Sequence, residues 1–452
     1  MKLLTALAVV SSLSTISGTL GFKSAPRVHV PRSISEFRAR HPYEAQHEAR
    51  SVVTIRPSAN DTDDISDEFV KGLHAANHGG TLHLLSNETY VIGKALDLTF
   101  LDNIHVRLDG EIAFTTNKSY WLANGFHHPF QNATTFWKWG GPNIKIYGEG
   151  TLNGNGESWW AYTTDTSLRP ILFYAQNTTN LQIEGIHFKD SPCWNNLIVT
   201  SKNTSFKDVV VTAKAQKSGV HPKNTDVLDS LNLDTLTMER IWSHVGDDCF
   251  SPKPNTSNIH VNDLYCVGGN GVSLGSIGQY SGVYDYIKNV LIENVWVMNS
   301  NYGALLKSWA GPDVGYGIID NVTFRNIYSG GNQYLGSIDS CYYLVDSSEC
   351  AKYPSQVNVT NIRFENFTGY NNGEEGNVVA SLVCGASSVC ENITFVDWNV
   401  KSACGGDPVY ICEGITGDIG VPCVNSSDPI AVSAKKATCT VTDAVATATP
   451  WL

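Results

Sequence analysis

Three carboxylates within a short stretch of this chain have a spacing that could support acid–base chemistry. Asp226 follows Asn224 and Thr225, and the adjacent pair Asp247 and Asp248 comes 21 and 22 residues later. Carboxylates held close together resist joint ionisation, so one can stay protonated while a neighbour is charged. Hydrolysis of a glycosidic bond needs this division between an acid and a base. Ordinary surface turns carry the same short motifs, so this spacing alone leaves both interpretations open.

Short β-strands are the elements that must position these carboxylates. Between residues 143 and 398 a pattern recurs in which an asparagine precedes alternating apolar residues, a small polar residue and a further apolar residue. This alternation is typical of a strand with one buried face. Because no helical segment separates the copies, the pattern favours a β-solenoid over a β-sandwich. Clear copies begin at Asn180, Asn258, Asn289, Asn321, Asn361 and Asn392.

The coil length of such a solenoid predicts which residues share a surface. Successive coils stack about 4.8 Å apart, so residues one coil apart lie side by side. The intervals from Asp226 to Asp247 and from Asp248 to Asn270 are 21 and 22 residues, which fits one bare coil each. The 37 residues from Asn270 to Lys307 fit a coil that carries a loop. We therefore expect these side chains in one patch, which requires neither a metal nor a cofactor.

Composition restricts the class of protein. The chain has 452 residues, of which 42% are hydrophobic and 16% charged, so it can bury a large core and is not disordered. Scarce methionine and the absence of helical heptads favour an all-β fold. The net charge of −12 and the lack of a basic stripe exclude nucleic acid as an expected partner. A polyanionic substrate would need a local cationic site on this acidic protein.

The first residues resemble a targeting segment. A positive Lys2 precedes the apolar run Leu3–Val10, which predicts a signal peptide over residues 1–21. Residues 22–50 are interpreted as an N-terminal arm or pro-segment, and residues 51–440 as one β-helix catalytic domain. No later stretch is apolar for about 18 residues, so no membrane anchor is expected. We expect a secreted monomer.

Cysteines and glycosylation sequons agree with secretion. Eleven cysteines without paired C-x-x-C motifs should mostly form disulfides in an oxidising compartment. An odd total leaves at least one free thiol among Cys193, Cys404 and Cys439, and a buried inert thiol is the favoured interpretation. Plausible pairs are Cys249–Cys266, Cys341–Cys350, Cys384–Cys390 and Cys412–Cys423. Sequons begin at Asn60, Asn87, Asn117, Asn132, Asn177, Asn203, Asn255, Asn321, Asn358, Asn366, Asn392 and Asn425.

The ordered motifs resemble those of glycoside hydrolase family 28, the polygalacturonase and rhamnogalacturonase family. The resemblance covers roughly residues 50–430, and the runs 249–255 and 412–423 are similar to its fungal exo-acting branch. The matching motifs are Asn224-Thr225-Asp226, Gly246-Asp247-Asp248, Gly269-Asn270-Gly271 and Leu305-Leu306-Lys307.

This resemblance implies a fold and a mechanism. The fold would be a single-stranded right-handed parallel β-helix, and hydrolysis would invert the anomeric centre. By carry-over, Asp247 protonates the leaving oxygen, while Asp226 and Asp248 hold and activate the attacking water. Inversion is associated with a gap of about 6.5–9.5 Å between acid and base. Cys249 and Cys266 would clamp the coils that carry these carboxylates.

Two departures from the family pattern influence the predicted substrate. Asn270 replaces a histidine and cannot titrate, and Leu305 replaces an arginine that could grip a carboxylate. A leucine would suit the methyl group of a deoxysugar. The sequence thus predicts an exo-glycosidase on rhamnose-containing pectin, an α-L-rhamnosidase or exo-rhamnogalacturonase. An exo-polygalacturonase and a non-catalytic pectin-binding β-helix are the alternatives. The predicted substrate-binding residues are Asn224, Asn270, Lys307 and Tyr302.

Overall fold

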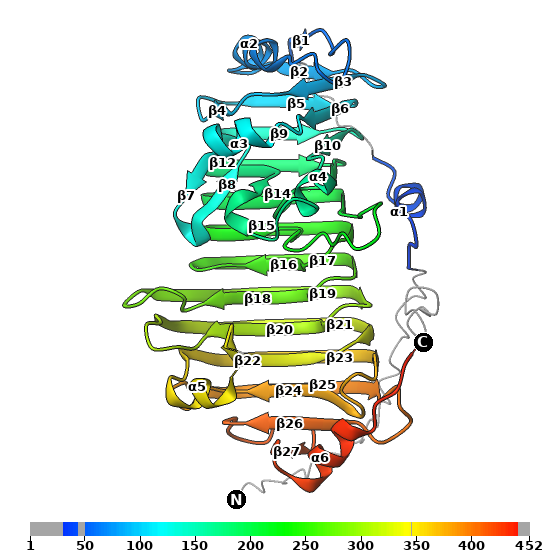
Figure 1. Cartoon of the computed structure of the whole chain (residues 1–452), viewed down its shortest axis with the longest axis vertical. Helices are drawn as coiled ribbons and strands as arrows, with labels where there is room; N and C mark the ends of the chain where they lie inside the picture. The colour runs from blue at the N-terminus through cyan, green and yellow to red at the C-terminus, as the bar shows by residue number, and fades with distance from the viewer. Residues whose placement is uncertain (1–29, 44–49, 345, 442–452) are drawn as a thin grey trace, which may run out of the picture.

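The chain forms a parallel β-helix, which confirms the predicted fold class (Figure 1). The computed structural model describes residues 30–43, 50–344 and 346–441, so the predicted signal peptide lies outside the described residues. Twenty-four strands belong to one hydrogen-bonded sheet that winds along the molecule. A second, three-stranded sheet lies beside the early coils.

Long strands form two sides of each coil and pair in parallel with the coil before and after them. Their register keeps apolar residues in line, as where Ile292 lies between Val261 and Phe324. The long strands are β9 (Trp137–Tyr147), β12 (Phe173–Glu184), β14 (Asn196–Thr212), β15 (Asp229–His244), β17 (Thr256–Val267), β19 (Tyr284–Met298), β21 (Tyr316–Asn332), β23 (Gln356–Asn371) and β25 (Cys390–Lys401).

Shorter strands complete the coils. A run of them stacks on the remaining side of the later coils and will carry the functional residues. These strands are β16 (Asp248–Pro252), β18 (Gly271–Ile277), β20 (Tyr302–Trp309), β22 (Gly336–Tyr342), β24 (Val378–Val383), β26 (Val409–Glu413) and β27 (Cys423–Val424). The early coils use β1 (Val52–Thr54), β2 (Thr81–Leu84), β3 (Thr89–Ile92), β4 (Leu96–Leu98), β5 (Ile104–Leu108), β6 (Glu111–Phe114), β10 (Thr151–Asn153) and β13 (His187–Lys189).

Helices lie outside the coils. The helix α2 (Ser66–Ala76) covers one end of the solenoid with buried Phe69 and Leu73, and α6 (Pro429–Lys436) lies at the other end (Figure 1). Among the described helices, none combines the length and apolar character needed to cross a bilayer. The remaining short elements are α1 (Ile34–Arg40), α3 (Lys118–Asn124), α4 (Glu157–Trp160), α5 (Ser347–Lys352), the 3-10 turns Phe130–Asn132 and Thr166–Leu168, and the small-sheet strands β7 (Phe126–His128), β8 (Ala133–Thr135) and β11 (Pro170–Ile171).

The repeated asparagine marks a corner of each coil. Asn258, Asn289 and Asn321 all have φ between 56° and 60°, a left-handed conformation that asparagine tolerates well. Their side chains form a ladder, because Asn289 donates to Asn258 at 3.0 Å and Asn321 donates to Asn289 at 2.9 Å. A second corner follows five residues later, where Asn326 donates to Asn294 at 2.9 Å. The repeated sequence pattern therefore covers the strand segment between these two corners of a coil.

Between the corners, inward side chains stack into one continuous core. Phe364 lies between Phe324 and Phe395, with ring centroids 5.3 and 4.7 Å away. All three rings are almost completely buried. Burying an aromatic side chain of this size stabilises a fold by roughly 1.5–3 kcal/mol. Stacking identical positions at the coil spacing thus holds successive coils in register.

Five disulfides are present in the described residues. The four pairs expected from spacing all form, and Cys404 pairs with Cys439, which the sequence left unassigned. The free thiol is Cys193, which is 3% exposed. Burial raises the pKa of Cys193 to about 12, so its reactive thiolate is scarce at neutral pH.

The described part of the predicted arm packs along the flank of the solenoid. Phe37 of α1 lies edge-on to Tyr265, with ring centroids 6.1 Å apart, and Trp242 donates a hydrogen bond to the carbonyl of Pro31.

All sequon asparagines are at least partly accessible. Nine are exposed, and three are half-buried, namely Asn255, Asn358 and Asn366.

Candidate active site

Four successive turns and strands bring the predicted site residues together. Asp226 lies in the turn before β15, Asp248 begins β16, Asn270 precedes β18, and Lys307 lies within β20. Parallel pairing of β16, β18 and β20 places these positions on one face of the solenoid. One oxygen from each of Asp226, Asp247 and Asp248 lies within 4.8 Å of the others.

This carboxylate separation is shorter than the gap expected for inversion. Oxygens within 4.8 Å fall below the range of about 6.5–9.5 Å that is associated with inverting enzymes. The physical reason is that Asp247 and Asp248 are neighbours in the chain and Asp226 lies only one coil away. The distance therefore gives no support to inversion, which stays a prediction from the family pattern.

Asp247 is the most accessible carboxylate of the cluster, and four donors hold it. The backbone N–H and side-chain amide of Asn224 lie 3.2 and 3.4 Å from Oδ2. The amide of Asn270 and the N–H of Asp248 donate to Oδ1 at 2.7 and 2.9 Å. Asp247 is half-buried, whereas Asp226 and Asp248 are 3% and 1% exposed. Asn224 and Asn270, which we predicted to bind substrate, thus orient an acidic group.

Electrostatics separate the three carboxylates. Burial, followed by the charge of Asp248, raises the pKa of Asp247 to about 6. Burial also raises the pKa of Asp226 well above its usual value, aided by the nearby carboxylates. Burial would raise the pKa of Asp248 too, but the ammonium groups of Lys307 and Lys253 outweigh it and lower that pKa. Lys307 Nζ lies 2.6 Å from Asp248 Oδ2. Asp248 is therefore the carboxylate that stays ionised.

Sequence reasoning missed a second buried ion pair beneath this cluster. Lys253 Nζ lies 3.1 Å from Asp229 Oδ1 and 3.9 Å from a carboxylate oxygen of both Asp226 and Asp248. Lys253 is 5% exposed and Asp229 is fully buried. Burial, only partly offset by Lys253, raises the pKa of Asp229 to about 6. The sequence did carry a signal for this pair, because Asp229 and Lys253 are charged residues that lie within or beside apolar strand patterns.

A buried arginine fixes the turn that carries the first motif. Arg169 is 1% exposed and donates to the side-chain oxygen of Asn224 at 2.9 Å. It also donates to the backbone carbonyls of Lys223 and Pro192 at 2.6 and 2.9 Å. No carboxylate pairs with it among the described residues. Because Arg169 lies 55 residues before Asn224 in the chain, nothing in the sequence connects them.

The remaining predicted residues lie at the edge of the cluster. Tyr302 begins β20 and stacks on Tyr334, with ring centroids 6.1 Å apart. Burial raises the pKa of Tyr302 to about 12, so its hydroxyl stays protonated and can donate. Leu305 is 2% exposed, so it offers almost no surface to a sugar methyl group.

The three aspartates also have the spacing of a metal site. Two features of the cluster oppose a divalent cation there. Lys307 and Lys253 already lie 2.6 and 3.9 Å from Asp248, so their charges would repel a metal ion. Raised pKa values of Asp226 and Asp247 also favour protonated forms, which are poor ligands.

The hydrogen bond from Asn270 is expected to lower the pKa of Asp247. Replacing Asn270 with alanine removes a donor that stabilises the Asp247 carboxylate, so the pKa of Asp247 should rise. The high-pH limb of the kcat/KM profile should then move to higher pH, and kcat should fall by about 10-fold. Asn301→Ala is the matched control, since Asn301 donates at 2.7 Å to Asn270 and leaves the contact with Asp247 in place. A limb that stays fixed in Asn270→Ala would contradict this role.

A parallel β-helix that gathers three aspartates above buried lysines has the fold and site of a polysaccharide-cleaving glycoside hydrolase. The chain belongs to glycosyl hydrolases family 28, whose profile matches residues 89–426. It is therefore an enzyme that hydrolyses O-glycosyl bonds, and the interpretation as a non-catalytic binding module is wrong.

Curated relatives and a solved structure agree with this family. A protein from Aspergillus oryzae named probable exopolygalacturonase B is 51% identical over 387 residues, covering 84% of this chain and 89% of the relative. Exopolygalacturonase B from Aspergillus niger is 49% identical over 400 residues, covering 87% and 91%. The crystal structure of endo-xylogalacturonan hydrolase from Aspergillus tubingensis superimposes with a TM-score of 0.77 at 27% identity, covering 83% and 99%.

These relatives correct the predicted substrate. The prediction of an enzyme for rhamnose-containing pectin is wrong, because relatives at about half identity are named exopolygalacturonases. Leu305 is covered by protein, so its apolar side chain cannot line a sugar-binding surface and gives no preference for a deoxysugar. Lys253 supplies a second cation next to the carboxylates.

Proposed function

We propose that the protein is a secreted exo-polygalacturonase that releases galacturonate from the end of a pectic chain. The observation that carries this proposal is the 51% identity, over 84% of the chain, to a protein named probable exopolygalacturonase B. The site is compatible with it, because the buried Lys253 and Lys307 offset part of the negative charge that would repel an anionic sugar. The density of sequons and the disulfides support secretion.

In this proposal the three aspartates have separate roles. Asp247, protonated below about pH 6, gives its proton to the glycosidic oxygen as the bond to the anomeric carbon breaks. Ionised Asp248 takes a proton from the water that attacks this carbon. Asp226 holds the water by hydrogen bonding. Lys307 keeps Asp248 ionised, and Asn224 and Asn270 hold Asp247 in place.

Product analysis on polygalacturonate tests the proposed activity. We expect galacturonate monomer as the only early product, with little loss of viscosity, and no release of rhamnose from rhamnogalacturonan or nitrophenyl rhamnoside. Oligomers of mixed length would instead indicate endo cleavage. Proton NMR of the first-formed anomer tests inversion separately, and retention of configuration would contradict that part of the proposal.

The pH dependence of kcat/KM should reflect the raised pKa of Asp247. Asp247 must be protonated to act as the acid, so activity should fall as the pH rises through about 6. The lowered pKa of Asp248 keeps the base ionised in mildly acidic solution. We therefore expect an optimum below pH 6, measured with digalacturonate across pH 3–8. Activity that continues to rise above pH 7 would contradict this assignment.

A further inference from the structure

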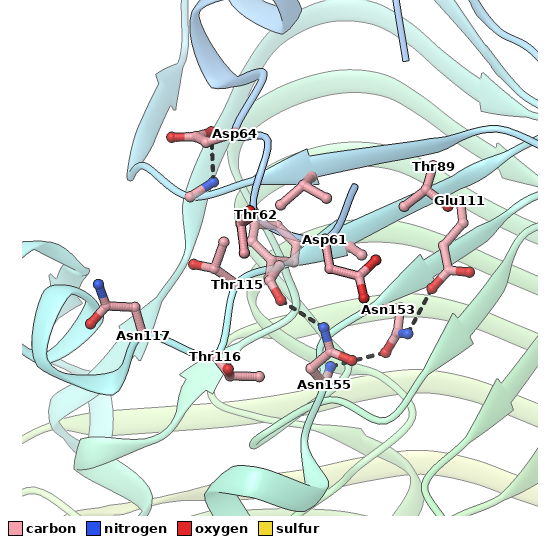
Figure 2. A pocket seen from close by; sticks show the side chains of 14 residues that line it. Asp61, Thr62, Asp64, Thr89, Glu111, Thr115, Thr116, Asn117, Asn153 and Asn155 are labelled. Carbon is pink, nitrogen blue, oxygen red and sulfur yellow. Dashed lines mark hydrogen bonds between the residues drawn. The ribbon is translucent and has the colours of Figure 1, made fainter. Parts of the chain in front are cut away.

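A polar pocket of about 800 Å³ lies on the early coils, apart from the catalytic cluster (Figure 2). Its walls are the loop before α2, the outer faces of β3 and β6, and the chain around β10 and the start of α3. None of the catalytic aspartates or buried lysines lines it. Its volume falls within the range of about 300–1,000 Å³ typical of small-molecule sites.

Small side chains on adjacent strands create the hollow. Val91, Ala113 and Asn153 occupy equivalent positions on three neighbouring strands. Gly93 directly follows β3, and a Cβ added there would lie 2.8 Å from a carboxylate oxygen of Asp64. The floor is therefore shallow and weakly apolar, while longer polar side chains form the rim.

The polar rim is held in place by its own hydrogen bonds. Asn153 donates to Glu111 Oε1 at 2.7 Å and accepts from the N–H of Asn155 at 2.9 Å. Asn155 donates to the carbonyl of Phe114 at 2.7 Å. Figure 2 shows Asp61, Glu111, Asn153 and Asn155 turned toward one another. Within the described residues no side-chain hydrogen bond or ion pair involves Asp61, so its carboxylate can accept from a ligand.

Charge decides which ligands this pocket suits. Three carboxylates line it, from Asp61, Asp64 and Glu111, and no lysine, arginine or histidine accompanies them. An anionic sugar such as galacturonate would be repelled. The three carboxylates of the pocket do not converge on one point as the described residues Asp226, Asp247 and Asp248 do, so they form no three-carboxylate metal site. Carboxylates, amides and hydroxyls around a small apolar floor suit an uncharged polyol.

We propose that this pocket binds an uncharged pyranose oligosaccharide. Acceptors such as Asp61 and Glu111 would hydrogen-bond adjacent sugar hydroxyls, and Ala113 would contact the C–H face of the ring. Two sources share this chemistry. One is a neutral side chain of the polysaccharide, and the other is an N-linked glycan of the protein itself. The second source is near, because Thr62, Thr89 and Asn117 line the pocket and belong to the sequons that begin at Asn60, Asn87 and Asn117.

Saturation-transfer NMR on the full secreted protein tests the proposal, with galactobiose and mannobiose as neutral probes. A second protein lacks the three sequons through Asn60→Gln, Asn87→Gln and Asn117→Asp, the last of which keeps a cap for α3. Ala113→Trp fills the pocket from the outer face of β6. Thr237→Trp on the exposed face of β15 is its matched control.

We expect a neutral disaccharide to bind the sequon-free protein and to lose at least 10-fold in affinity in Ala113→Trp, whereas Thr237→Trp retains binding. Equal binding to the glycosylated protein would identify an external saccharide as the ligand. Binding only after sequon removal would identify the protein's own glycan. Failure of both neutral probes to bind the sequon-free protein would overturn the proposal, and so would binding that survives Ala113→Trp.

Discussion

Asp247→Asn should lower kcat on polygalacturonate by about 10²–10⁴-fold, because asparagine cannot supply the proton that the leaving oxygen needs. The substitution keeps the shape of the side chain, although its single amide oxygen can accept from Asn224 or from Asn270 and not from both. Substrate binding should change little, so the loss should appear in kcat rather than in KM. Steady-state kinetics on digalacturonate measure both constants.

The stability of the same variant relative to the native protein should depend on pH. The folded-state pKa of Asp247, about 6, lies above its usual value of 3.8. Stability from this group is therefore fully present below pH 3.8 and is lost as the pH rises through about 6. A neutral asparagine avoids that loss, so the difference in Tm, variant minus native protein, should be more positive at pH 7 than at pH 4.

Asp263→Asn provides the matched control. Burial raises the pKa of Asp263 as well, but this residue occupies a coil corner with φ of 56°, outside the cluster of Asp226, Asp247 and Asp248. Asparagine suits that corner, as the other copies of the repeat show. Asp263→Asn should retain native turnover. If Asp247→Asn were equally active, the assignment of the general acid would be wrong.

Lys253→Met should destabilise the fold by roughly 3–5 kcal/mol, the usual result of removing one partner of a buried ion pair. The loss leaves the carboxylate of Asp229 fully buried without the cation 3.1 Å away. Without Lys253 the pKa of Asp229 should rise further, so the destabilisation should be smaller at pH 4, where Asp229 is protonated. Denaturant unfolding at pH 4 and 7 measures the difference.

Activity should respond to Lys253→Met through a different carboxylate. Lys253 Nζ lies 3.9 Å from Asp248 Oδ2 and helps to lower its pKa. Removing this charge should raise the pKa of the proposed base, so the acidic limb of kcat/KM should move to higher pH. The position of this limb on the pH axis does not depend on the concentration of folded enzyme, so the shift can be measured even if some protein unfolds.

A double variant separates the two effects. Lys253→Met with Asp229→Asn removes the unpaired charge and should restore most of the stability, while the shifted acidic limb should persist. Lys94→Met is the control for losing a lysine, because Lys94 forms an exposed pair with Asp67 at 2.7 Å and should change Tm little. If Lys253→Met is as stable as the native protein, or if the double variant does not regain stability, then the Lys253–Asp229 pair does not stabilise the fold by the expected amount.

Local patterns in the sequence determined the solenoid and much of the site. The corner asparagines and the alternating apolar residues depend on backbone conformation and burial within one coil, so they repeat visibly along the chain. A fixed coil length then placed Asp226, Asp247, Asp248 and Asn270 on one face. Close cysteine pairs were predictable for the same reason, because their partners lie within a few residues or one coil.

Contacts that cross loops of irregular length were decided only by the tertiary structure. Arg169 reaches the Asn224 turn from 55 residues away, and Cys404 meets Cys439 beyond the last full coils. The burial of Leu305 and the pairing of Lys253 with Asp229 depend on which neighbours cover each strand face, and alternation alone does not reveal this. The period of the repeat in the sequence determines which coil a residue occupies. The protonation state and the solvent exposure of its side chain depend on the residues that surround it in the folded protein.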